Sequence, residues 1–336
     1  MNDMSPHDQL LRMISGYWLT QAIYVAAKLS LADFLKDGPR APDDLAAATG
    51  THPLSLRRLL RALASVGIFA ETGDGRFSLT PLAQPLRSDL PGSQRALAVM
   101  NGEEHYRAYG ELLHSVQTGE PGFDKVYGLP VFDYLGQHPE QGAVFDAAMT
   151  GVHGAEAAAM VEAYDFSWAA TVMDIGGGNG STLAAVLQRW PKIQGTLFDL
   201  PAVVARAKPA LAAAGVADRC QTVGGSFFES VPGEKDIYML RHIIHDWDDE
   251  KSQLILRNCR AAIGGRPAKL LVIENVIPAG NAPGFGKLLD LTMLVIPGGL
   301  ERTEPEYREL FAACGFRLTE IIPTTASVSL IVGEPV

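Results

Sequence analysis

The sequence predicts an α/β protein in which a helical N-terminal domain with a winged-helix order of elements precedes a doubly wound sheet. Three observations predict this fold. Apolar residues recur at helical spacing up to about residue 165, short apolar runs alternate with helical segments after about residue 170, and a glycine-rich run follows the first of them. At 336 residues the chain is long enough for more than one packed unit.

The first hundred residues follow the order helix, short helix, helix, hairpin. Helical spacing covers residues 10–35, a short helix is expected over 43–48, and a third helix over 53–66. Two short runs, 68–71 and 76–79, are separated by a glycine-rich turn and predict a hairpin. This order is that of a winged helix.

A winged helix leaves two interpretations. One is DNA binding, with Arg57, Arg58 and Arg61 on the third helix, and the other is a dimerisation domain that uses the same shape. The formal net charge of −10 argues against a polyanion partner, because phosphate contacts need a cationic surface. We therefore predict a dimerisation domain over residues 1–100, a homodimer, and no nucleic-acid partner.

Residues 101–165 are expected to be helical and to link the two domains while contributing to a substrate pocket. Aromatic, methionine and histidine side chains gather here, which suits a flat apolar ligand, although core packing explains such residues equally well. The candidate substrate-binding residues are Met100, His105, Tyr106, Phe132, Phe145, Met149 and His153.

Membrane, secretory and metal-cluster classes are disfavoured. No apolar run approaches the roughly 20 residues of a membrane span, and the N-terminus lacks the basic and apolar regions of a signal peptide. Cys220, Cys259 and Cys314 are odd in number and widely spaced, as expected for thiols in a reducing cytosol. We predict a cytoplasmic protein without a membrane partner or a bound metal.

Residues 166–336 alternate strands with helices, which predicts a parallel sheet covered by helices on both faces. The expected strands are Thr171–Ile175, Gly195–Phe198, Cys220–Val223, Asp236–Leu240, Lys269–Glu274, Arg317–Ile322 and Ser327–Val332.

The glycine run Gly176-Gly177-Gly178-Asn179-Gly180 follows the first of these strands and precedes a helix expected over 182–188. Such a loop at the carboxyl end of a central strand is where open α/β sheets bind nucleotides. A dinucleotide site would need a third glycine at Ser181, and Asp174 would repel a pyrophosphate. A carboxylate at this position suits a cationic sulfonium or an α-amino group instead.

Two further groups of polar residues follow later strands. Asp199 ends the second expected strand, where a carboxylate can accept both hydroxyls of a ribose or cap the helix that follows. His245 lies beyond the carboxyl end of the fourth strand, with Asp246 beside it, whereas Asp248 and Asp249 look like the capped start of a helix. Metal binding is a weaker interpretation of this cluster because it lacks a set of spaced ligands.

Four segments in this order resemble the metal-independent, homodimeric small-molecule O-methyltransferases, which include plant caffeate and flavonoid enzymes and bacterial polyketide-tailoring enzymes. The resemblance covers nearly the whole chain and implies a Rossmann-like methyltransferase sheet and S-adenosylmethionine as cofactor. The segments are Asp-Ile-Gly-Gly-Gly-Asn-Gly (174–180), Phe-Asp-Leu-Pro (198–201), His-Asp-Trp-Asp-Asp (245–249) and Gly-Gly-Leu-Glu-Arg-Thr (298–303).

The resemblance implies a cofactor site in which Gly176 and Gly178 line the methionine part and Asp199 holds the ribose. Relatives carry an Asp-Met pair at the adenine, where this chain has Ser226 and Phe227, so the apolar contact is kept and the acid is not. Arg241 matches a lysine of the plant enzymes and is a further cofactor contact.

The resemblance also implies the catalytic residues. His245 matches the general base, and Glu274 and Glu301 match the two acids that flank it. Asp290 and Met293 fall in an Asp-x-x-Met-Leu segment expected to shape the substrate pocket.

The predicted reaction is methyl transfer to a hydroxyl of a small aromatic, phenolic or polyketide-like substrate. A phenolic hydroxyl ionises near pH 10 and a histidine near 6.5, so full proton transfer to an unassisted imidazole costs about 5 kcal/mol. A nearby carboxylate narrows this gap by favouring the imidazolium. N-methylation or other cofactor-assisted tailoring, a nicotinamide oxidoreductase and a ligand-sensing DNA-binding regulator remain alternative functions.

Overall fold

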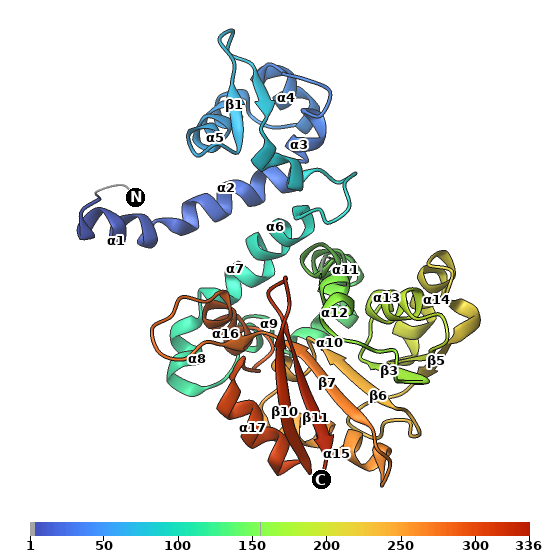
Figure 1. Cartoon of the computed structure of the whole chain (residues 1–336). Coiled ribbons are helices and arrows are strands. Elements are labelled where there is room, and N and C mark those ends of the chain that lie inside the picture. Colours follow the sequence, from blue (N-terminus) through green and yellow to red (C-terminus); the bar gives the residue numbers. More distant parts are fainter. Residues whose placement is uncertain (1–3, 155) are drawn as a thin grey trace. The chain divides into compact units, whose positions relative to one another are not determined.

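The computed structural model describes residues 4–154 and 156–336, which fall into two compact units (Figure 1). The first holds the described residues up to Gly110 together with Lys125–Gly154, and the second holds Glu111–Asp124 and 156–336. The segment 101–165 is therefore divided between the units. No helix of the described residues is both long enough and apolar enough to cross a membrane.

The N-terminal unit confirms the winged-helix order. Its elements are α1 (Pro6–Ile14), α2 (Gly16–Lys28), α3 (Leu31–Phe34), α4 (Pro42–Thr49), α5 (Pro53–Ser65), β1 (Phe69–Glu71), β2 (Phe77–Leu79), η1 (Pro81–Leu86), α6 (Arg95–Gly102), α7 (Glu104–Tyr109), α10 (Val131–Gln137) and α11 (Pro139–His153); α9 (Gly122–Tyr127) spans the boundary between the units. β1 and β2 pair antiparallel, as expected. Leu31, Leu45, Leu60 and Phe77 lie at the centre of a buried apolar cluster that joins these helices to the hairpin.

The single helical stretch expected over residues 10–35 is three helices. Ser15 separates α1 from α2, and Ser30 adopts a left-handed conformation with φ +55° between α2 and α3. The apolar side chains of α1 and of the first turn of α2 are largely exposed. Leu10, Leu11, Met13, Ile14, Tyr17, Trp18 and Leu19 are each at least 40% exposed.

The C-terminal unit is built on a seven-stranded sheet in the order β10-β11-β7-β6-β3-β4-β5 (Figure 1). Its strands are β3 (Thr171–Ile175), β4 (Gln194–Asp199), β5 (Cys220–Gly224), β6 (Ile237–Arg241), β7 (Lys269–Glu274), β10 (Phe316–Pro323) and β11 (Ser329–Pro335), and a small second sheet pairs β8 (Val276–Ile277) with β9 (Arg302–Thr303). Its helices are α8 (Leu112–Thr118), α12 (Glu156–Ala163), α13 (Ser181–Arg189), α14 (Pro201–Ala213), α15 (Asp249–Ile263), α16 (Phe285–Val295) and α17 (Glu304–Ala313), with short turns η2 (Ala217–Arg219) and η3 (Ile244–Asp246).

The sheet is mixed rather than fully parallel. The five strands β3 to β7 run parallel, but β11 is antiparallel to both β10 and β7. The physical reason is the short connection 324–328, which allows a hairpin but not the crossover that a parallel pair requires.

Helices cover both faces of the sheet, as predicted. Alternate residues of a strand enter different cores: Leu271 and Ile273 pack with α13 and α14, whereas Leu270 and Val272 pack with α15 and α17. The chain extends the sheet from β3 to β5 on one side and then returns to place β6 on the other. The carboxyl ends of β3 and β6 therefore flank the switch point where open α/β sheets bind ligands.

Candidate active site

The glycine loop after β3 contacts the histidine segment after β6. Gly176 has φ +67°, and a Cβ at this position would overlap the Cδ1 of Ile243, two residues before His245. Glycine is required here because the backbone is left-handed and the space is filled. The two segments predicted to hold cofactor and base are therefore adjacent.

Asp174 presents a buried carboxylate beneath this loop. It is 1% exposed, and its Oδ2 has no hydrogen-bond partner among the residues the structure describes. Burial raises the pKa of Asp174 to about 7, while the positive charge of Arg241 opposes the shift and Asp199 adds to it. A buried carboxylate oxygen without a donor is costly, which suits a cationic or N–H-bearing ligand at this point.

Asp199 is tied to the glycine loop. Its Oδ2 accepts a 2.9 Å hydrogen bond from the backbone N–H of Gly178, and its Oδ1 accepts one of 2.7 Å from Leu200. The interpretation of Asp199 as the cap of α14 is wrong, because Leu200 is the N-cap residue and has no side-chain cap bond. The carboxylate instead fixes the loop that Gly178 belongs to.

Three further residues, Phe227, Ser226 and Arg241, were predicted to contact the cofactor, and each has a different neighbour in the structure. The Phe227 ring lies 3.6 Å from the Cβ position of Gly176, so it packs against the glycine loop, whereas the Ser226 hydroxyl accepts from the backbone of Phe228. Arg241 makes an ion pair with the buried Glu156 at 3.1 Å.

His245 is buried and held by a carboxylate. Its Nδ1 lies 2.7 Å from Oε1 of Glu301, and its Nε2 lies 3.6 Å from Oδ1 of Asp246. With the Nδ1–H donated to Glu301, Nε2 is the nitrogen left to accept a proton. The predicted pairing of His245 with Glu301 is thus present.

The charges around His245 make it a strong base. Burial alone would lower the pKa of the imidazole, but Asp246, the Glu301 hydrogen bond and the charge of Glu274 together raise it to about 10. Burial also raises the pKa of Asp246 to about 7, against the effect of His245. The pKa of the His245 imidazole therefore matches the pKa of about 10 that phenols have.

Glu274 reaches His245 through the backbone rather than through the ring. Its Oε1 accepts hydrogen bonds from the backbone N–H groups of Ile243, Ile244 and His245, at 3.1, 2.7 and 3.1 Å. Its Oε2 accepts from the Tyr307 hydroxyl at 2.6 Å. Glu274 holds the backbone under His245 and adds negative charge nearby.

Asp290 and Met293, on α16, support the segment that carries Glu301. Asp290 Oδ1 accepts from the backbone N–H of Glu301 at 2.8 Å, and the Met293 carbonyl accepts from Gly298 and Gly299. A Cβ at Gly299 would overlap the backbone carbonyl of His245, so only glycine allows this approach.

Sequence reasoning missed two buried residues that brace the site. Arg302 is 1% exposed and donates to Asp249, Ser252 and the carbonyls of Ile244, Trp247 and Leu300. Tyr307 is fully buried against Glu274. The position of Arg302 directly after Glu301 in the motif 298–303 was the available signal for the first, whereas nothing local marked the second.

The predicted substrate residues before residue 154 all belong to the N-terminal unit. Met100 (α6) and His105 (α7) are buried, and burial lowers the pKa of His105 to about 4. Tyr106 is 39% exposed, and Phe132 meets Phe145 edge to face at 6.3 Å. Met149 and His153 lie on α11. Their part in binding a substrate stays a prediction.

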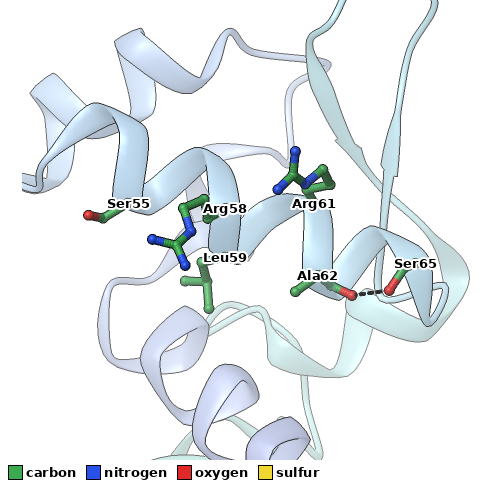
Figure 2. Close-up of a pocket in the computed structure, with 6 residues that line it drawn as sticks. All are labelled: Ser55, Arg58, Leu59, Arg61, Ala62 and Ser65. Atoms are coloured by element: carbon green, nitrogen blue, oxygen red, sulfur yellow. Dashed lines mark hydrogen bonds between the residues drawn. The ribbon is translucent and has the colours of Figure 1, made fainter.

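The N-terminal unit also has a surface hollow of about 550 Å³ on α5. Figure 2 shows Arg58 and Arg61 extending from this helix beside Leu59 and Ala62. No carboxylate and no histidine is among its lining residues, so it offers no acid–base pair for the predicted chemistry.

Comparisons with known proteins agree with this geometry. Residues 109–317 match the O-methyltransferase domain model, and residues 11–89 match the O-methyltransferase dimerisation domain. A phenazine O-methyltransferase, PhzM, of Lysobacter antibioticus is 50% identical over 327 residues, covering 97% of this chain and 96% of that protein. An 8-amino-8-demethylriboflavin N,N-dimethyltransferase of Streptomyces davaonensis is 40% identical over 305 residues, covering 90% and 87%.

Solved structures agree as well. The crystal structure of LaPhzM, 50% identical, superposes with a TM-score of 0.95 over 99% of this chain and 100% of that one. The O-methyltransferase NcsB1 from neocarzinostatin biosynthesis, solved with S-adenosylmethionine and 2-hydroxy-5-methyl naphthoic acid, is 35% identical with a TM-score of 0.84, covering 95% and 96%. The chain therefore belongs to the O-methyltransferase family, and it is an S-adenosylmethionine-dependent O-methyltransferase.

Proposed function

We propose that the protein methylates a hydroxyl of a small, flat aromatic acceptor, such as a hydroxylated phenazine or naphthoate, with His245 as the general base. The observation that carries the proposal is the 2.7 Å pairing of His245 Nδ1 with the buried Glu301, on a segment that touches the glycine loop. The acceptor class follows the names of the phenazine and naphthoate relatives.

The residues around the glycine loop fit S-adenosylmethionine. The unpartnered Oδ2 of Asp174 suits its α-amino group or its sulfonium, and Phe227 offers an apolar surface to an adenine. The left-handed Gly178, with open space at its Cβ position, leaves the backbone accessible to a ligand. Asp199 keeps lone pairs beyond its two backbone bonds for a ribose. Bound there, the cofactor supplies an electrophilic methyl group on a positively charged sulfur.

His245 then accepts the proton of the acceptor hydroxyl. As the acceptor oxygen takes the methyl group that a bound cofactor would supply from its sulfonium, the hydroxyl proton would pass to Nε2, the imidazole nitrogen that Glu301 leaves free. The charges that raise the pKa of His245 to about 10 stabilise the imidazolium that results. His245 is 6% exposed, so bulk water has little access to its ring.

A homodimer accompanies this function. The exposed apolar residues of α1 and α2, between Leu10 and Leu19, form an apolar stripe in which Met13, Ile14 and Trp18 are 76, 65 and 64% exposed. It lies within the region that matches the dimerisation domain, apart from its first residue, Leu10. Burying such a stripe is favourable, so we propose that a second copy of the chain covers it.

The test is a labelled-methyl transfer screen over hydroxyphenazines, phenols, hydroxynaphthoates and heterocyclic amines, with the wild type, His245→Gln and His7→Gln. We expect an oxygen acceptor and a loss of turnover on the order of 10²-fold or more in His245→Gln, with S-adenosylhomocysteine affinity within about threefold of wild type. The exposed His7 is the matched control and should behave as wild type. Near-wild-type turnover of His245→Gln would refute the base assignment.

N-methylation is the second candidate, favoured by the similarity to the riboflavin dimethyltransferase. It predicts labelled product from the amines and not from the phenols, because an amine presents its own lone pair and needs a base less.

A further inference from the structure

Tyr307 contacts Glu274, the carboxylate that holds the backbone of His245, and the proposed proton transfer does not use its hydroxyl. It sits on α17, one residue after Glu306, which forms a capping box with Thr303 at the start of the helix. The side chain is fully buried, and its hydroxyl lies 2.6 Å from Oε2 of Glu274.

The Tyr307 hydroxyl is a permanent donor. Burial, the neighbouring charges of Glu274 and Glu301, and the hydrogen bond to Glu274 raise its pKa well above the ordinary value. The hydroxyl therefore stays protonated throughout the working pH range and donates its hydrogen bond to Glu274 at every pH of interest.

Glu274 connects this donor to the catalytic segment. Its other oxygen, Oε1, accepts from three successive N–H groups, those of residues 243, 244 and 245. The Glu274 side chain is 0% exposed, so its oxygens depend on donors within the protein rather than on water. Within residues 4–154 and 156–336, the donor to Oε2 is the Tyr307 hydroxyl.

We propose that Tyr307 is a positioning residue for methyl transfer: its hydroxyl fixes the Glu274 carboxylate, which holds the backbone of residues 243–245 and so sets the place of the His245 ring. This inference rests on the proposed role of His245 as the base. Without the hydroxyl, Glu274 either takes up a proton or turns away from the backbone.

Both outcomes reach His245. A protonated Glu274 removes one of the charges that raise the pKa of the imidazole, so that pKa falls. A rotated Glu274 frees three backbone N–H groups and loosens the ring. The other titratable or charged groups that face these two residues are Glu301, Asp246, His242 and Arg302.

The test compares Tyr307→Phe with Tyr238→Phe in the full-length protein. Tyr238 is an equally buried tyrosine whose hydroxyl donates to the Ala262 carbonyl, away from Glu274. We expect Tyr307→Phe to lower kcat about tenfold or more, to change KM for the acceptor by less than about threefold, and to move the rising limb of the pH profile of kcat/KM to lower pH. Amide hydrogen exchange of the peptide that covers residues 243–247 should accelerate, and S-adenosylhomocysteine affinity should stay within about threefold.

Tyr238→Phe should change neither the rising limb of the pH profile of kcat/KM nor the hydrogen exchange of the peptide that covers residues 243–247. If the two variants match each other, or if Tyr307→Phe matches wild type, the positioning role is overturned. A second pair, Glu274→Gln with and without Tyr307→Phe, covers the case in which the single variant does not fold. The glutamine amide carries no charge, so adding Tyr307→Phe to Glu274→Gln should not move the rising limb of the pH profile any further. A further shift in the double variant would overturn the proposal.

Failure of the proposed function gives a different result. If His245→Gln keeps its turnover, then His245 is not the base and the pH limb has another source. If His245→Gln is inactive while Tyr307→Phe behaves as Tyr238→Phe, the base assignment stands and only the inference about Tyr307 falls.

Discussion

Replacing Glu301 with glutamine isolates the effect of one charge on the base. The amide keeps the size of the side chain and an oxygen that can accept from His245 Nδ1, now 2.7 Å away, but it removes the negative charge. Two unit charges about 4 Å apart interact by about 4 kcal/mol at an effective dielectric constant of 20, equivalent to about three pKa units as an upper bound. We therefore expect the pKa of His245 to fall by about one to three units from its value of about 10.

This fall changes the maximum rate more than the rate at neutral pH. With His245 as the proposed base, the productive complex shares one proton between Nε2 and the acceptor hydroxyl. Because the pKa of His245 and that of a phenol are both about 10, we expect this proton to move at almost no cost in the wild type. In Glu301→Gln the pKa of His245 falls below that of the acceptor hydroxyl, and each pKa unit of this difference adds about 1.4 kcal/mol to the cost of moving the proton. The maximum of kcat/KM should therefore fall on the order of 10- to 10³-fold. At pH 7 both enzymes form the imidazolium–phenolate pair equally rarely, so their rates should differ by less than about tenfold.

The assay is the initial rate of labelled-methyl transfer between pH 6 and 10.5, with a phenolic acceptor whose own pKa is measured by absorbance. The rising limb should move to lower pH in Glu301→Gln, while the falling limb, set by the hydroxyl, stays. Glu320→Gln, on the exposed face of β10, is the matched control. A loss of rate that is the same at every pH, or a limb that does not move, would refute the electrostatic role and leave Glu301 a purely structural residue.

Two further predictions concern the scaffold. Gly299→Ala forces a Cβ into the backbone of residues 245–247 and should lower the stability of the C-terminal unit by about 3 kcal/mol, measured as a fall in Tm, whereas Gly265→Ala, with open space around its Cβ, should not. Trp18→Glu places a charge in the exposed apolar stripe of α2 and should convert the dimer to a monomer in sedimentation velocity, whereas Leu54→Glu, on an equally exposed site of α5, should stay dimeric; a dimeric Trp18→Glu would exclude this stripe as the interface.

Much of the fold was predictable because local patterns encode it. The strand expected over Lys269–Glu274 has those bounds in the structure, and Asp248 caps α15, as predicted from its position before a helical run. Strand and cap signals depend on neighbours in the sequence, so they can be read without the tertiary structure. The glycine loop belongs to the same class, since the left-handed Gly176 and Gly178 are required by the local turn.

Features that depend on distant partners were not predictable. The break at Ser30 is a single left-handed residue inside a continuous helical pattern, and the antiparallel β11 depends on a hairpin between two strands expected to be parallel. Tyr307 looks like any apolar residue of an amphipathic helix, and only packing shows that its hydroxyl meets Glu274. No spacing rule connects residues that are 33 positions apart in the chain.

The two glutamates illustrate why a motif gives the residues of a site but not their tasks. Both were expected to flank the imidazole, yet Glu301 contacts the ring and Glu274 contacts the backbone beneath it. Asp290, on α16, accepts from the backbone N–H of Glu301 and so helps to position the acid that contacts His245. Because Glu274 and Asp290 accept from backbone N–H groups, these two acids also determine the position of the backbone that donates to them. The charge that strengthens the base and the bonds that hold it in place are therefore supplied by the same side chains, and their separate effects can be measured only by changing charge and shape independently.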